Sequence, residues 1–173
     1  MKHKEFLLSE FWVLSWGASV QRAGLYKSGS DPTKRANFRT DVIGYVTDRL
    51  MPLYKRPVTE RKHLKNIEEL SRHGSRLGRS ILSKDGYRIG VAQKLLNLQL
   101  KYLWCTDLVS EPPHCPVDRV IINKTRLRNQ VSWTQMTSID EYAEVISAIR
   151  EKSDASGCSL AQWELAVFDR SDA

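Results

Sequence analysis

The chain has 173 residues, of which 41% are hydrophobic and 27% charged, and it carries a formal net charge of +7. These fractions are typical of globular proteins and exclude an intrinsically disordered chain. No run of about 18 apolar residues is present, so the sequence predicts no membrane-spanning helix. The length predicts a single domain, residues 1–173, that can bury its own hydrophobic core.

The N-terminal half of the chain predicts helices. Apolar residues recur three or four positions apart over residues 4–26 and again over 34–51, which is the spacing of one helix face. Pro52 ends the second of these helices. A third helix begins near residues 57–59, where Thr59 is the expected N-cap. Residues 72–79 are basic and rich in Gly and Ser, and they predict a loop or a short helix.

The C-terminal half predicts four more helices. A strong apolar pattern covers residues 89–104, and Pro116 suits the first turn of a helix over 116–123. Ser138 begins a helix over 139–152 with Glu141 as the acid of a capping box, and Ser159 starts the last helix. No strand-like alternation persists beyond a few residues. The sequence therefore predicts an all-α fold of about seven or eight helices, as one compact domain or as two lobes around a cleft.

The charge is concentrated in the first 139 residues. Residues 140–173 contain eight acidic and three basic side chains, which leaves 24 basic and 12 acidic side chains for residues 1–139. A basic body of this size is a candidate surface for a polyanion, so we expect a nucleic-acid partner. A basic surface that serves only solubility is the alternative.

The cysteines and histidines give no reason to expect a metal or another cofactor. The three cysteines are an odd number without a CxxC pair, which indicates the reducing cytoplasm. His114 and Cys115 are adjacent, but the other histidines lack the paired spacing of a zinc site. Nucleotide-binding glycine motifs and HExxH are also absent.

Two short motifs stand at the starts of predicted helices. Residues 90–94 read Gly-Val-Ala-Gln-Lys and residues 116–118 read Pro-Val-Asp, so Lys94 and Asp118 are 24 positions apart. A neutral lysine amine is a nucleophile, and a carboxylate opposite it stabilises a cationic transition state at a sugar carbon. Loss of a base from deoxyribose passes through such a state. Lys94 and Asp118 are therefore the candidate catalytic pair.

These motifs resemble those of the helix-hairpin-helix DNA glycosylases, and among them the 8-oxoguanine DNA glycosylases. The family motif is Leu-Pro-Gly-Val-Gly-x-Lys followed by Pro-Val-Asp, and residues 88–94 and 116–118 are the matching segments. Leu-Pro is missing here and Ala92 replaces the second glycine. The resemblance implies a hairpin element, a lysine Schiff base at Lys94 with strand cleavage by β-elimination, and the essential aspartate role for Asp118.

The resemblance continues at the C-terminus and covers residues 86–125 and 138–170, whereas residues 1–85 match nothing in the family. In the family, a polar residue and an aromatic residue one turn apart on the last helix clamp the extruded base. Glu164 and Phe168 are spaced four apart and are the matching pair. The implied partner is double-stranded DNA with a damaged or modified purine, bound by a monomer that needs no cofactor.

The basic run before the hairpin supplies the candidate contacts to the DNA backbone. A helix that opens at a glycine turn leaves backbone N–H groups free to hold a phosphate, so Gly90 is included. The full set of expected contacts is Gly90, Arg72, Arg76, Arg79, Lys84 and Arg88.

Each candidate residue also has a simpler interpretation. Lys94 belongs to a polar stripe that would face water on an amphipathic helix, and Asp118 is an acid favoured by a helix N-terminus. Glu164 would be an acid at a rim and Phe168 a core residue. A helical module that binds nucleic acid or protein without catalysis, such as a degenerate glycosylase in a defence system, is the alternative function.

Overall fold

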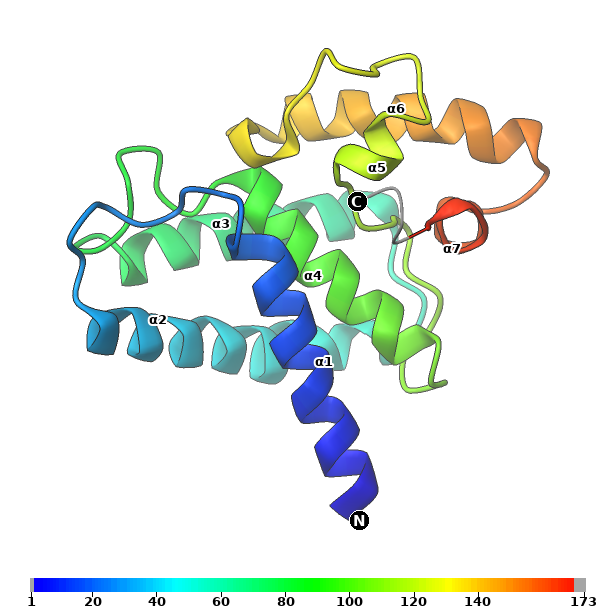
Figure 1. Cartoon of the computed structure of the whole chain (residues 1–173). Coiled ribbons are helices and arrows are strands. Elements are labelled where there is room, and N and C mark those ends of the chain that lie inside the picture. Colours follow the sequence, from blue (N-terminus) through cyan, green and yellow to red (C-terminus); the bar gives the residue numbers. More distant parts are fainter. Residues whose placement is uncertain (1, 170–173) are drawn as a thin grey trace.

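The computed structural model describes residues 2–169, and their regular structure is entirely helical (Figure 1). The prediction of a compact all-α fold is confirmed. No helix among the described residues is long and apolar enough to cross a membrane. The α-helices are α1 (Lys2–Val20), α2 (Pro32–Tyr45), α3 (Glu60–Leu77), α4 (Ile89–Trp104), α5 (Arg119–Ile122), α6 (Ile139–Ala155) and α7 (Leu160–Val167). Shorter turns are the π-helix η1 (Val46–Leu50) and the 3₁₀ helices η2 (Met51–Lys55) and η3 (Trp133–Gln135).

Side-chain caps fix where most of these helices begin. Asp31, Thr59 and Asp118 accept backbone N–H groups from the first turns of α2, α3 and α5. Ser138 and Ser159 form complete capping boxes at α6 and α7. These caps occupy the N–H groups that a helix start leaves unpaired.

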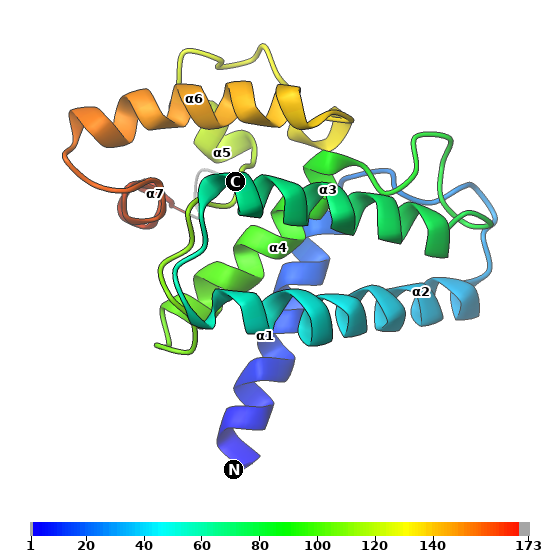
Figure 2. The ribbon, with the colours of Figure 1, turned by 180° about the vertical axis from the view of Figure 1, so that it is seen from behind.

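The central helix is α4, which is buried from Ile89 to Leu100 (Figures 1 and 2). It contacts α1, α3, α6 and η3. The two views place α1 and α3 on opposite sides of α4. The polar residues Gln93, Lys94, Asn97 and Gln99 are buried with the leucines of this helix. The interpretation of Lys94 as part of a water-facing stripe is therefore wrong, because Lys94 is only 5% exposed.

Three segments differ from the sequence-based prediction. The first helix, expected to extend to residue 26, ends at Val20, and residues 21–24 form turns. Residues 72–77, expected to form a loop or a short helix, continue α3 without interruption. The small residues there seat Tyr87: a Cβ on Gly74 would stand 2.6 Å from the Tyr87 ring, and Ser71 and Ser75 hydrogen-bond the Tyr87 backbone. The helix expected from Pro116 begins only at Arg119, because Asp118 adopts an extended conformation and acts as the N-cap.

Candidate active site

A cavity of about 930 Å³, here called the Lys94 cavity, opens between α1, α4, α5, the loop of residues 129–134 and α7. All four side chains predicted to act on the substrate line it: Lys94, Asp118, Glu164 and Phe168. These residues come from three separate elements that only the tertiary fold brings together.

Lys94 and Asp118 form a close ion pair. The Lys94 Nζ atom donates to Asp118 Oδ2 at 2.6 Å, and the two side chains are only 6% and 15% exposed. Asp118 Oδ1 accepts the Ile121 N–H at 3.0 Å, so the N-cap bond fixes the orientation of the carboxylate. The Trp133 ring lies 6.0 Å from Lys94 Nζ. An amine, a carboxylate and an aromatic wall therefore meet at one point of the cavity.

Glu164 is paired with Lys101, two turns along α4 from Lys94. The Lys101 Nζ atom lies 2.7 Å and 3.0 Å from the two Glu164 carboxylate oxygens. Burial raises the pKa of Glu164, and the positive charge of Lys101 opposes this shift. The Glu164 side chain is 2% exposed, so it is not a rim acid. Phe168 is half-buried, and its ring centroid is 4.7 Å from Lys101 Nζ.

Sequence reasoning missed two members of this arrangement. Lys101 belongs to neither sequence motif, although its spacing of seven from Lys94 places both on one helix face. Trp133 is one of five tryptophans in the chain and also belongs to neither motif. It is buried, but it also lines the cavity beside Lys94. No local pattern in the sequence shows that the segment after α5 folds back over α4.

Two of the predicted backbone contacts are corrected by the structure. The Arg88 side chain is buried, and its guanidinium donates to the carbonyl oxygens of Thr134, at 2.7 Å, and Ala23. The Gly90 N–H donates to the Met136 carbonyl at 3.0 Å. Neither residue is free to bind a phosphate, because the chain covers both.

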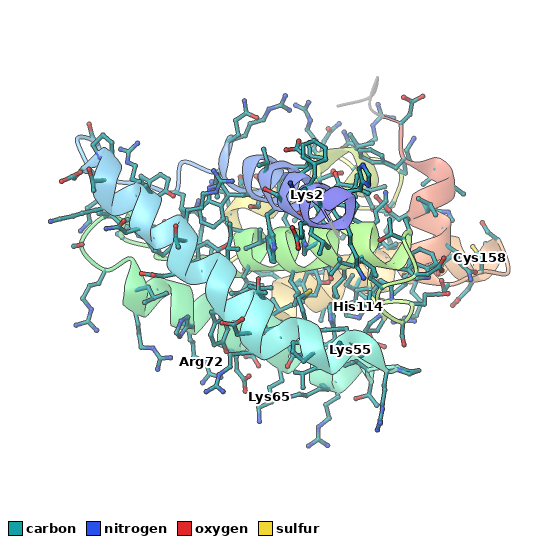
Figure 3. The ribbon with its side chains drawn as sticks, turned by 90° about the horizontal axis from the view of Figure 1, so that it is seen from below. Lys2, Lys55, Lys65, Arg72, His114 and Cys158 are labelled. Carbon is teal, nitrogen blue, oxygen red and sulfur yellow. The ribbon has the colours of Figure 1, made fainter. Side chains whose placement is uncertain are left out.

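The other four predicted contacts are exposed but do not line the cavity. They are Arg72, Arg76, Arg79 and Lys84. Arg72 and Arg76 lie on α3, across α4 from α1, and Figure 3 shows Arg72 at the edge of the molecule opposite α1. The exposed cations that line the Lys94 cavity are instead Arg22 and Arg119.

A buried histidine, His114, belongs to a hydrogen-bond network that begins at Asn97 of α4. Asn97 Nδ2 donates to the Tyr142 hydroxyl at 2.9 Å, and this hydroxyl lies 2.9 Å from His114 Nδ1. His114 Nε2 in turn lies 3.1 Å from Glu60 Oε1. Burial lowers the pKa of His114 to about 3, and the charge of Arg150 adds to this shift. His114 is therefore neutral at neutral pH and donates its Nε2–H to Glu60.

No group of three or more metal-binding side chains occurs among residues 2–169. No family model matches the chain, and comparisons with curated proteins and with solved structures also find no match. The chemistry of the cavity and the motif resemblance therefore remain as the indications of function.

Proposed function

We propose that the protein is a DNA glycosylase and abasic-site lyase that acts through a lysine Schiff base. The observation that carries this proposal is the 2.6 Å contact between Lys94 and Asp118 in the wall of a cavity that also holds Glu164 and Phe168. The residues matched by the glycosylase resemblance are thus gathered at one place. A nucleophile, a stabilising carboxylate and a binding surface for a base are the parts that such an enzyme requires.

The reaction begins when the Lys94 ammonium gives up a proton to the base, and the neutral amine that results attacks C1′ of deoxyribose. The C1′–N bond breaks, its electron pair leaves with the base, and Asp118 stabilises the positive charge that develops on the sugar. Proton transfer to the ring oxygen then opens the sugar and leaves an imine between Lys94 and C1′. Loss of a proton from C2′ expels the 3′ phosphate and cleaves the strand.

The other end of the cavity is the proposed site for the extruded base. The exposed part of the Phe168 ring offers a stacking surface. Glu164 accepts hydrogen bonds from ring N–H groups, and Lys101 holds its carboxylate in place. The substrate class is a damaged or modified purine that resembles 8-oxoguanine.

The DNA backbone is proposed to dock on the face that carries the cavity. Residues 1–139 supply the excess of positive charge, and Arg22 and Arg119 stand at the cavity itself. This assignment replaces Arg88 and Gly90, whose donors are used within the fold. Affinity should fall steeply with salt, because each phosphate contact releases counterions.

Borohydride trapping tests the proposal. Borohydride reduces the imine to a stable amine, so protein mixed with duplexes containing 8-oxoguanine or an abasic site should form a crosslinked band. Lys94→Gln should abolish the band and leave DNA binding intact, whereas Asp118→Asn should slow base release. Lys101→Gln is the matched control, since it removes a second, partly buried lysine of α4 and should keep the crosslink on the abasic duplex, which has no base for Glu164 to bind.

The alternative is that the two buried ion pairs only join α4 to α5 and α7. In that case the protein binds nucleic acid or another protein without catalysis. A wild-type protein that binds duplex DNA but forms no crosslink on either substrate would support this alternative and refute the enzyme. A crosslink only on the abasic duplex would mean strand cleavage without base excision.

A further inference from the structure

The fully buried side chain of Gln93 hydrogen-bonds the backbone of Val117, the residue directly before Asp118. Its Nε2 donates to the Val117 carbonyl at 2.8 Å, and its Oε1 accepts the Val117 N–H at 3.1 Å. One amide group therefore satisfies both backbone groups of a single residue, as a neighbouring β-strand would.

This bond pattern is important because the segment before Asp118 has little other support. Within the described part of the chain, residues 111–117 make no backbone–backbone hydrogen bond. Three of them are prolines, which lack an N–H. Side chains hold the segment instead: Gln93 binds Val117 and Tyr142 binds His114.

Gln93 is itself fixed in orientation. Its Nε2 also donates to the Gly90 carbonyl at 3.0 Å, and its Oε1 accepts a hydrogen bond from Asn97 Nδ2 at 3.2 Å. The same Asn97 nitrogen binds the Tyr142 hydroxyl. Because all these groups are buried, the amide cannot turn over without leaving several of them unpaired.

We propose that Gln93 is a positioning residue that sets the distance between Lys94 and Asp118. Gln93 directly precedes Lys94, and Val117 directly precedes Asp118, so the amide contact lies one residue from the ion pair on both segments. This inference rests on the proposed function, because the distance is important only if Lys94 reacts. Gln93 itself does not touch the substrate.

The chain provides a matched control for a merely structural role. Gln99 is also a buried glutamine of α4, and its Oε1 accepts a hydrogen bond from Ser15 Oγ of α1 at 3.0 Å. Replacing it removes a buried amide from the same helix without touching residues 117–118. A general loss of packing should therefore affect both variants, whereas a positioning effect should affect only the Gln93 variant.

The experiment compares wild type, Gln93→Met and Gln99→Met on a duplex with one abasic site in the presence of borohydride. It measures the crosslinking rate at saturating protein, the protein concentration that gives half of that rate, and the melting temperature. Gln93→Met should slow the saturated rate about 100-fold, as expected for a displacement near 1 Å at a reacting group. Both variants should keep the half-saturating concentration within about threefold of wild type, and Gln99→Met should also keep the rate.

The outcomes separate this inference from the proposed function. A folded Gln93→Met variant that crosslinks at the wild-type rate, or an equal loss in Gln99→Met, overturns the positioning role and leaves the enzyme in place. A wild-type protein that never crosslinks removes both. If Gln93→Met does not fold, Gln93→Asn keeps the amide but is one methylene too short to reach both Val117 groups, and the same rate comparison applies.

Discussion

Replacing Gly90 with alanine should destabilise the protein, although alanine is the better helix former. A Cβ at Gly90 would overlap the Trp133 carbonyl oxygen and stand 2.9 Å from its carbon. Ordinary van der Waals contact begins at 3.4 Å, so this carbon must move by about 0.5 Å and the oxygen by more. The Gly90 N–H bond to Met136 joins the same two segments and would lengthen with that movement.

The opposing contributions can be compared. Overpacking of a buried contact typically costs about 1–3 kcal/mol, and a weakened buried hydrogen bond costs about 1 kcal/mol. The higher helix propensity of alanine, compared with glycine, offsets about 0.5–1 kcal/mol of this loss. We therefore expect Gly90→Ala to lower the free energy of unfolding by about 2 kcal/mol. Gly17→Ala is the control, because nothing lies within 4 Å of its Cβ and the protein should become slightly more stable.

Urea unfolding of both variants measures this difference. A Gly90→Ala protein as stable as wild type would refute the close approach of α4 and the segment at Trp133.

Three further predictions concern pH, the base site and the DNA face. Below about pH 6.5 His114 binds a proton in the unfolded chain, but in the folded chain it does so only near pH 3. The free energy of unfolding should therefore decrease by about 1.4 kcal/mol for each unit by which the pH is lowered within this window. His114→Gln should reduce the pH dependence of urea unfolding between pH 7 and pH 5, whereas the exposed His3→Gln should not; the buried His63, whose pKa burial also lowers, accounts for the slope that remains. Phe168→Ala should reduce base release per folded molecule more than it lowers the melting temperature, because the ring is only half-buried; the opposite pattern would make Phe168 a core residue. In a plot of the logarithm of the binding constant for duplex DNA against the logarithm of the salt concentration, Arg119→Gln should make the slope shallower by about 0.9, and Arg72→Gln should leave it unchanged. The reverse result would indicate that the DNA binds at α3.

Local sequence signals predicted the helices well where a cap or a strong apolar pattern defines them. Ser138 with Glu141, Thr59, and the apolar run of residues 89–104 correspond to the observed helix starts and to α4. The continuation of α3 through residue 77 was not predictable in this way, because Gly74 is there to admit the Tyr87 ring from the loop that follows α3. Such tertiary contacts override local propensity.

The candidate site was predictable only in part. The motif resemblance selected Lys94, Asp118, Glu164 and Phe168, and all four line one cavity. The backbone contacts were less predictable, because a run of basic residues before a helix is typical of an exposed surface. The buried guanidinium of Arg88 donates to the carbonyl oxygens of residues that lie 46 and 65 positions away in the sequence, and no local pattern indicates these contacts.

The proposed enzyme requires a covalent bond between the Lys94 amine and deoxyribose. The most direct measurement is mass spectrometry of the borohydride-reduced crosslink after trypsin digestion. Trypsin does not cleave after a modified lysine, so an adduct on Lys94 should appear on a peptide of residues 89–101. An adduct on a peptide of residues 95–119, which would place it on Lys101, or an adduct on the N-terminal amine would show that Lys94 is not the nucleophile.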